Sequence, residues 1–252
     1  MPTPLDLLLN PITLIILGMY LFLMLWEAVF PARKMPVVPY WHLKGIIAFV
    51  VYFFISSYLP FLYAHWLPTF HLLNLSGMNV IAGAIIAILA NELGVYIWHR
   101  TMHGQKFLWR VFHQMHHSAE RIDTYGAYYF SPADMIGWTV LGTVVFSFIT
   151  GLPPESIGIM LLVLNFLNIL QHANIKTPVW LGYIVQRPES HAVHHEKGVH
   201  AYNYCSIPLF DMLFNTFRNP SKYVPENGFY YGASARVKEM LLFKEVDKPL
   251  NK

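Results

Sequence analysis

The sequence predicts an all-α integral membrane protein: a helical bundle of four to five transmembrane helices with a cytoplasmic helical cap that carries a histidine-bound dimetal site. Its 252 residues are 55% hydrophobic and only 12% charged, whereas about a quarter of the residues of a soluble domain are charged. Several apolar stretches approach the roughly 20 residues needed to cross a bilayer core. Histidines recur at helical spacing just beyond the ends of these stretches.

Five apolar stretches are expected to form the bundle, and they cover residues 8–26, 45–63, 80–98, 135–151 and 157–170. The first is expected to be retained, because no basic residue precedes it and no small-residue cleavage site follows it. The last two are short and are joined by Gly-Leu-Pro-Pro, which cannot continue a helix. They therefore form a hairpin that either crosses the membrane or dips through one leaflet. Because no repeat or linker is visible, residues 1–252 are expected to form a single membrane-embedded domain.

The basic residues predict the orientation of the bundle. If all five stretches cross, all seventeen lysines and arginines fall on one side, which the positive-inside rule places in the cytoplasm. Two crossings separate His99, after the third stretch, from His172, after the fifth, so both are expected on that same face. The chain ends Lys-Pro-Leu-Asn-Lys, without a dilysine signal, which favours a bacterial inner membrane over the endoplasmic reticulum as the alternative.

Eight of the thirteen histidines form three short clusters, and a ninth lies alone between the second and the third. The clusters read His-Arg-Thr-Met-His, His-Gln-Met-His-His and His-Ala-Val-His-His, and the nine predicted metal ligands are His99, His103, His113, His116, His117, His172, His191, His194 and His195. Imidazoles three or four residues apart on a helix face one another and can converge on a metal. Because one metal takes about four to six ligands, nine indicate two metals. His200 lies outside the repeated spacing.

The ligand types narrow the metal and the class of protein. With one cysteine and few carboxylates, imidazole suits iron, zinc, copper or nickel; iron is expected, and zinc is possible in purified protein. A zinc hydrolase would show His-Glu-x-x-His, whereas Glu196 is followed by His200 one residue too late. A membrane metal transporter or metal-binding protein remains an alternative, although transport ligands are expected near the bilayer midplane. Basic residues are interspersed with acidic ones, which indicates no nucleic-acid partner.

On these motifs the chain resembles the fatty acid hydroxylase and sterol desaturase superfamily, a group of histidine-rich membrane di-iron oxygenases. The resemblance runs from about residue 92 to 217 and includes Glu92 seven residues before the first histidine, Asn174 after the lone one, and a closing Pro-Leu-Phe-Asp-Met-Leu-Phe-Asn-Thr-Phe segment. The chain departs from some relatives at Ser131 and Asn168, where those relatives carry histidine.

The resemblance implies an O2-dependent oxidoreductase that uses two iron ions, with O2 as co-substrate. It implies hydroxylation of an unactivated C–H bond in a membrane lipid, either an acyl chain or a sterol-like molecule, with desaturation at the same site as the alternative. No haem-binding segment is visible, so electrons are expected from a separate donor, which would be a cytochrome b5-like protein, a ferredoxin or a reductase.

Other side chains near the clusters are expected to support the site or the membrane interface. Glu92 shares a helix face with His99 and is expected to accept a hydrogen bond from a ligand histidine or a buried polar partner; the alternative is an interhelical bond with no effect on the metal. Four more acids either orient ligand rings or are simply solvated: Asp123, Glu189, Glu196 and Asp211. The aromatic run Tyr125, Tyr128, Tyr129 and Phe130 is expected to line the membrane interface.

Overall fold

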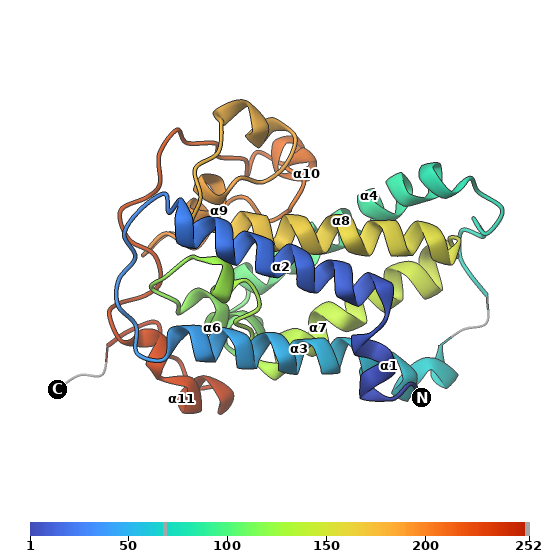
Figure 1. Ribbon diagram of the computed structural model, residues 1–252, viewed down its shortest axis with the longest axis horizontal. Coiled ribbons are helices and arrows are strands. Elements are labelled where there is room, and N and C mark those ends of the chain that lie inside the picture. The colour runs from blue at the N-terminus through green and yellow to red at the C-terminus, as the bar shows by residue number, and fades with distance from the viewer. Residues whose placement is uncertain (68–69, 250–252) are drawn as a thin grey trace.

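The computed structural model describes residues 1–67 and 70–249, and this part of the chain is helical without any β-strand (Figure 1). The long segments are α2 (Pro11–Val29), α3 (Trp41–Tyr63), α4 (Val80–Gly104), α7 (Pro132–Thr143) with its π-helical continuation η4 (Val144–Thr150), and α8 (Pro154–His172). α8 packs against both α2 and α4, and α3 packs against α7. The predicted all-α class is thus confirmed for the described residues.

Four of these segments are long and apolar enough to cross a membrane, namely Pro11–Val29, Trp41–Trp66, Val80–Gly104 and Pro154–His172. Their outward faces carry large exposed apolar side chains such as Leu14, Ile15 and Ile47. In water such a surface would promote aggregation, whereas in a bilayer it is solvated by lipid. The segment Pro132–Phe146 is apolar but shorter, so the four-to-five range of the prediction holds.

Local capping explains where several of these helices begin. Asn10 and Asn79 accept hydrogen bonds from the backbone amides of Ile12 and Ile81 in the first turns of α2 and α4. Ser131 caps α7 in the same way, so this helix starts three residues before the expected 135. Gly151, with a φ of +55°, ends η4 and opens the turn to α8.

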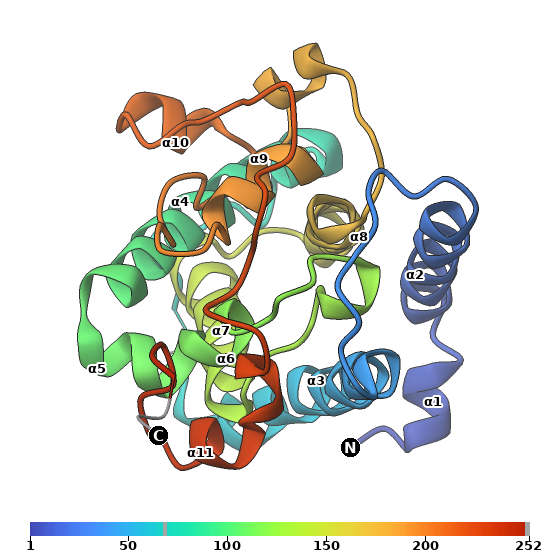
Figure 2. The same ribbon diagram turned by 90° about the vertical axis from the view of Figure 1, so that its left-hand side faces the viewer.

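Short helices gather at one end of the bundle and form the cap (Figures 1 and 2). They are α5 (Lys106–Leu108), η2 (Trp109–His113), α6 (Gln114–His117), η3 (Thr124–Gly126), η5 (Val179–Tyr183), α9 (Pro188–His194), α10 (Leu209–Leu213), η6 (Ala233–Ala235) and α11 (Val237–Leu241). α1 (Pro4–Leu8) and η1 (Ala64–Trp66) lie near the opposite end. The carboxyl ends of α4 and α8 meet at the cap, as expected for His99 and His172. That the cap faces the cytoplasm stays a prediction. The expected bacterial inner membrane rests partly on residues 250–252, which lie outside the described part of the chain.

One buried carboxylate ties the cap to the bundle. Glu27, near the end of α2, accepts hydrogen bonds from the backbone amides of Thr124 (2.9 Å) and Asn174 (3.0 Å). The side chain of Asn174 in turn donates to the carbonyl oxygen of Arg33 at 2.7 Å. Asn174, singled out by the resemblance, therefore fixes the segment that follows His172 rather than facing a metal.

Candidate metal centre

The nine predicted histidines lie together in two compact groups, and His200 belongs to neither. The five-histidine group contains His99, His103, His113, His117 and His194, and the four-histidine group contains His116, His172, His191 and His195. Within each group one ring nitrogen from every member lies within 4.8 Å of the others. All are buried except His103, which is partly exposed. The two groups adjoin each other, because the rings of His117 and His195 stack with centroids 4.1 Å apart.

Each His-x-x-His-His cluster contributes to both groups. His113 and His117 are four residues apart and share the five-histidine group, while His116 belongs to the other. In the third cluster the pair four residues apart, His191 and His195, enters the four-histidine group instead. A spacing of four places two rings on one face, and the remaining histidine lies on a neighbouring face of the same turn. One turn of helix thus supplies ligands to two adjacent groups.

Backbone carbonyls orient many of the rings. Nδ1 of His99 donates to the carbonyl oxygen of Tyr204 and Nδ1 of His194 to that of Tyr202, both at 2.7 Å. The same arrangement joins His103 to the carbonyl of His200 and His172 to that of Asn168, again at 2.7 Å. A carbonyl can only accept, so Nδ1 carries the proton and the lone pair of Nε2 is directed into the group.

The inward nitrogens are crowded and short of donors. The Nε2 atoms of His99 and His113 lie 2.8 Å apart, and Nε2 of His172 lies 3.1 Å and 3.0 Å from those of His116 and His191. The buried Nε2 atoms of His103, His117 and His194 have no hydrogen-bond partner. Converging lone pairs repel one another unless a cation lies between them. The donor set therefore fits one imidazole-bound metal ion in each group.

Burial keeps the cap histidines ready to bind metal. Removal from water, reinforced by neighbouring histidines, lowers the pKa of His113, His117 and His194 well below the ordinary value. The same causes lower the pKa of His116 and His191. These rings are therefore neutral at physiological pH, which is the form that binds a metal.

A carboxylate that the sequence did not indicate contacts a predicted ligand; it is Asp134, at the start of α7. Its Oδ2 lies 2.9 Å from Nδ1 of His113, and both side chains are almost completely buried. A carboxylate in this position orients the ring and makes Nε2 a stronger ligand. Its sequence signal was an acid three residues after the capping Ser131, at the edge of an apolar stretch.

Three of the four acids that the sequence places near the clusters bind other groups. Asp123 accepts from the indole nitrogen of Trp41, and Glu189 accepts from the backbone and hydroxyl of Thr177. Asp211 accepts from the backbone amides of Tyr204 and Cys205. Glu196 follows α9 and pairs with Asn227 in an isolated bridge. Asp123 and Glu189 also pair with Arg121 and Arg187, and none of these contacts is to a ligand ring. Among these acids and Asp134, the contact with a ligand ring is that of Asp134.

We expect Asp134→Asn to weaken metal binding about tenfold, the lower end of the 10- to 100-fold range for such partners, because a neutral amide is a poorer acceptor. Zinc affinity, measured by competition with a chelator, tests this. Glu27→Gln is the matched control, since it neutralises a buried carboxylate whose partners are Thr124 and Asn174. An unchanged affinity in Asp134→Asn, or an equal loss in both variants, would contradict the role of Asp134.

Glu92 has a buried polar partner, and that partner is the backbone. Its Oε2 accepts from the amide of Ile207 at 2.7 Å, and its carbonyl oxygen accepts from Sγ of Cys205 at 3.5 Å. These bonds hold the 204–207 loop, in which the carbonyl of Tyr204 orients His99. Of the two expected partners, the structure has the buried polar group rather than a ligand histidine. An effect of Glu92 on the metal stays a prediction.

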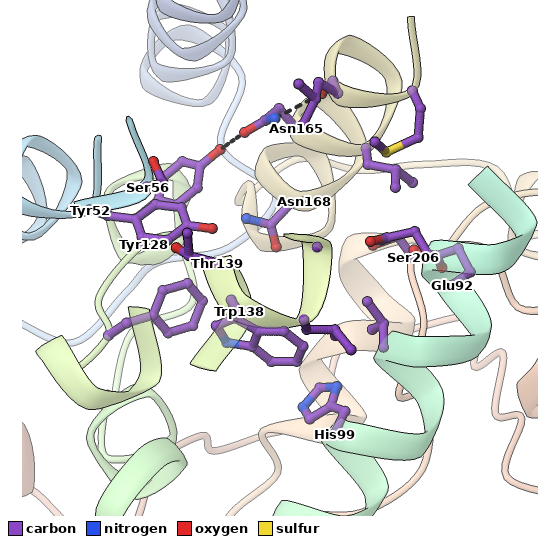
Figure 3. A pocket seen from close by; sticks show the side chains of 18 of the residues that line it. Tyr52, Ser56, Glu92, His99, Tyr128, Trp138, Thr139, Asn165, Asn168 and Ser206 are labelled. Atoms are coloured by element: carbon purple, nitrogen blue, oxygen red, sulfur yellow. Dashed lines mark hydrogen bonds between the residues drawn. The ribbon is translucent and has the colours of Figure 1, made fainter. Parts of the chain in front are cut away.

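A cavity of about 450 Å³ connects both histidine groups to the interior of the bundle. It is lined by His99 and His113 of one group and by His116, His172 and His191 of the other. From there it runs between α3, α4, α7 and α8, and Figure 3 shows His99 at one end and Asn165 toward the other. Four polar residues of α4 and α8 line it: Asn91, Glu92, Asn165 and Asn168.

The expectation for the aromatic run is wrong for three of its members. Tyr129 is 1% exposed and donates to the carbonyl of Ser234 inside the cap. Tyr128 and Phe130 are 2% and 7% exposed and line this cavity instead of the membrane interface. The segment that carries them folds inward between α3 and α8, where Tyr128 stacks on Tyr52 and donates to Asn165. Spacing alone indicated aromatic residues near the bilayer surface but not which way the segment folds.

Comparison with known proteins adds independent information. The model of the fatty acid hydroxylase family matches residues 84–216, which include all nine histidines. Ornithine lipid hydroxylase OlsE of Rhizobium tropici is 30% identical over 148 residues, covering 57% of this chain and 43% of the relative. Sphinganine C4-monooxygenase 1 of Arabidopsis thaliana is 26% identical over 149 residues, 57% of each chain. Very-long-chain aldehyde decarbonylase GL1-9 of Oryza sativa is 25% identical over 130 residues, 51% of this chain and 50% of the relative.

The chain thus spans about half the length of the curated relatives it matches. No solved structure matches it significantly. The matched region carries the histidine clusters, most of α4, and α7 and α8, whereas α2 and α3 precede it.

Proposed function

The chain belongs to the fatty acid hydroxylase family, and from this premise we propose that it is an O2-dependent oxidoreductase that hydroxylates an unactivated C–H bond of a membrane lipid. The substrate is an acyl chain or a sterol-like molecule, and the centre is a pair of iron ions held by the nine histidines. The observation that carries the proposal is the cavity, which leads from five of these histidines into an apolar bundle. An elongated apolar molecule fits such a space, since ligand pockets measure roughly 300–1,000 Å³.

The residues of the chain have defined tasks in this reaction. Iron bound at the two groups would supply the reduction of O2 and the removal of a hydrogen atom from the substrate. The carbonyls of Tyr204 and Asn168 hold the ligand rings in one tautomer and orientation. Apolar cavity residues such as Leu141, Met160 and Leu164 exclude water and align the hydrocarbon. Electrons come from a separate donor, either a cytochrome b5-like protein, a ferredoxin or a reductase.

Lipid mass spectrometry of cells with and without the gene tests the proposal. We expect one lipid class to gain a single oxygen atom only in cells that express the chain, and the purified protein to hold two metal ions. Cells that express a variant with both His113 and His194 changed to alanine serve as the control and should show no product. Loss of two hydrogen atoms would instead establish desaturation, and metal uptake without any lipid change would establish a transporter.

The location proposed for this activity follows from the same reasoning. The one-sided distribution of lysine and arginine supports a metal centre on the cytoplasmic side, in a bacterial inner membrane or, as the alternative, the endoplasmic reticulum. A donor protein in the cytoplasm would then reach the cap directly. Protease digestion of sealed vesicles that expose only one face tests the orientation.

A further inference from the structure

A second cavity, of about 270 Å³, lies in the wall of the bundle between α2, α3 and α8. Most of its lining is apolar, with Ile12, Ile16 and Leu17 from α2 and Phe49 and Phe53 from α3. Both α2 and α3 are candidate membrane helices. The cavity therefore lies at a depth where the surrounding solvent is hydrocarbon.

The second cavity is on the outer side of the bundle. Figures 1 and 2 show α2 at the outside, beside α8 and apart from α3 over much of its length. α2 turns half-buried side chains such as Ile12 and Ile16 toward the cavity, while Leu14 and Ile15 are 49% and 46% exposed on its other face. An acyl chain in the bilayer thus borders the same helix that lines the cavity.

The two cavities share one wall. Five residues line both of them: Tyr52, Ser56, Tyr128, Leu161 and Asn165. At the centre of this wall the hydroxyl of Tyr128 donates to Oδ1 of Asn165 at 3.0 Å (Figure 3). The ring of Tyr128 also stacks on Tyr52, with centroids 5.4 Å apart. Side-chain contacts therefore fill the wall that separates the second cavity from the histidine-lined cavity.

Opening this wall requires the displacement of one side chain and of no long helix. Tyr128 lies in the non-helical segment between η3 and α7, so its ring can swing without displacing a long helix. Nδ2 of Asn165 donates to the carbonyl of Leu161 at 2.7 Å, a bond within α8 that does not depend on Tyr128. Opening thus costs one neutral hydrogen bond and the ring contacts of Tyr128 with Tyr20, Phe49 and Tyr52.

We propose that a lipid acyl chain reaches the histidine-lined cavity laterally from the bilayer, through the second cavity, and that the Tyr128–Asn165 hydrogen bond is the gate. The proposal rests on the proposed function, because it gives the route by which that substrate arrives. The molecule that occupies this route is the hydrocarbon chain of a membrane lipid. We infer this because apolar faces of candidate membrane helices line the route from the outside of the bundle to its interior.

Photolabelling tests the route without requiring turnover. The protein is placed in phosphatidylcholine vesicles in which one acyl chain carries a diazirine, and labelled peptides are located by mass spectrometry after irradiation. Met160 lines only the histidine-lined cavity and is 1% exposed, so its labelling reports a chain inside that cavity, and a variant that blocks the shared wall decides whether the chain entered there. Leu14, which faces the bilayer, reports ordinary lipid contact and correct insertion.

Ser56→Trp fills the shared wall and is expected to reduce labelling of Met160 at least about tenfold while labelling of Leu14 is unchanged. Val50→Trp is the matched control, since Val50 lies on the same helix, is 44% exposed and lines neither cavity. Ser57→Phe, in the second cavity alone, serves as an independent block if Ser56→Trp does not fold. Tyr128→Phe removes the gate bond and should speed labelling of Met160 about fivefold.

The outcomes separate this proposal from the proposed function. Labelling of Met160 that is absent in the wild type, or equal in the Ser56 and Val50 variants, overturns the route whatever the enzyme does. If Ser56→Trp reduces labelling of Met160 in a protein that changes no lipid, the route is supported and the proposed reaction is contradicted.

Discussion

His172→Ala is expected to reduce the metal content of the purified protein from two ions per chain to one, and to lower lipid product by at least about two orders of magnitude. His172 is central to the four-histidine group, with Nε2 at 3.1 Å and 3.0 Å from those of His116 and His191. Its removal leaves three imidazoles on one side of an emptied space, while the five-histidine group keeps all its members. Elemental analysis of the protein, together with product formation, measures both effects.

His200→Asn is the matched control for this loss. His200 is a partly exposed neighbour of the site, with Nδ1 at 3.2 Å from Nδ1 of His117, yet it belongs to neither group. Its carbonyl, which accepts from His103, remains in the variant, and asparagine tolerates the φ of +43° found there. This variant should keep two ions. Equal metal loss in the two variants would contradict the assignment of nine ligands.

Histidine spacing predicted which side chains converge, because periodicity is a local property that a helix preserves. Val80, expected as the first residue of the third apolar stretch, is the first residue of α4, since Asn79 caps it. Division of the histidines between two sites could not be predicted in the same way. It depends on how the turn with His116 and the turn with His194 are rotated against α4 and α8, which only tertiary packing decides.

The missed features share a physical cause, since each depends on contacts between distant segments. Asp134 meets His113 across 21 residues of sequence, and nothing in the local pattern distinguishes it from a helix-capping acid. Tyr128 was expected at the membrane interface because tyrosine is enriched at that depth. Its actual position follows from stacking against Tyr52 on α3. Local chemistry thus indicated the metal ligands, and the partners that hold them in place required the fold.

Arg187→Ala is expected to destabilise the protein by about 3–5 kcal/mol, because it removes a completely buried guanidinium from a saturated network. Arg187 contacts Glu189 at 3.1 Å, the hydroxyl and carbonyl of Thr177 at 3.0 Å and 2.9 Å, and Asn219 at 2.7 Å. Its own carbonyl accepts from the amide of His191 at the start of α9. The variant leaves Glu189 buried without its cationic partner, in the helix that carries two of the nine histidines and is followed directly by a third, His195.

For a chain of this size the loss corresponds to a decrease in Tm of roughly 10 °C, measured by thermal unfolding of the metal-free protein in detergent. Metal-free protein is used because bound metal would add its own stabilisation to the folded state. Lys197→Ala is the control: Lys197 follows the same helix and pairs with Glu226 at 2.6 Å, but the two side chains are 46% and 66% exposed. Solvent screens that pair, so its loss should cost less than about 1 kcal/mol. Equal decreases in Tm in the two variants would contradict this prediction. They would mean that the buried contacts of Arg187 stabilise the protein no more than an exposed ion pair does, and that apolar packing holds α9 in place.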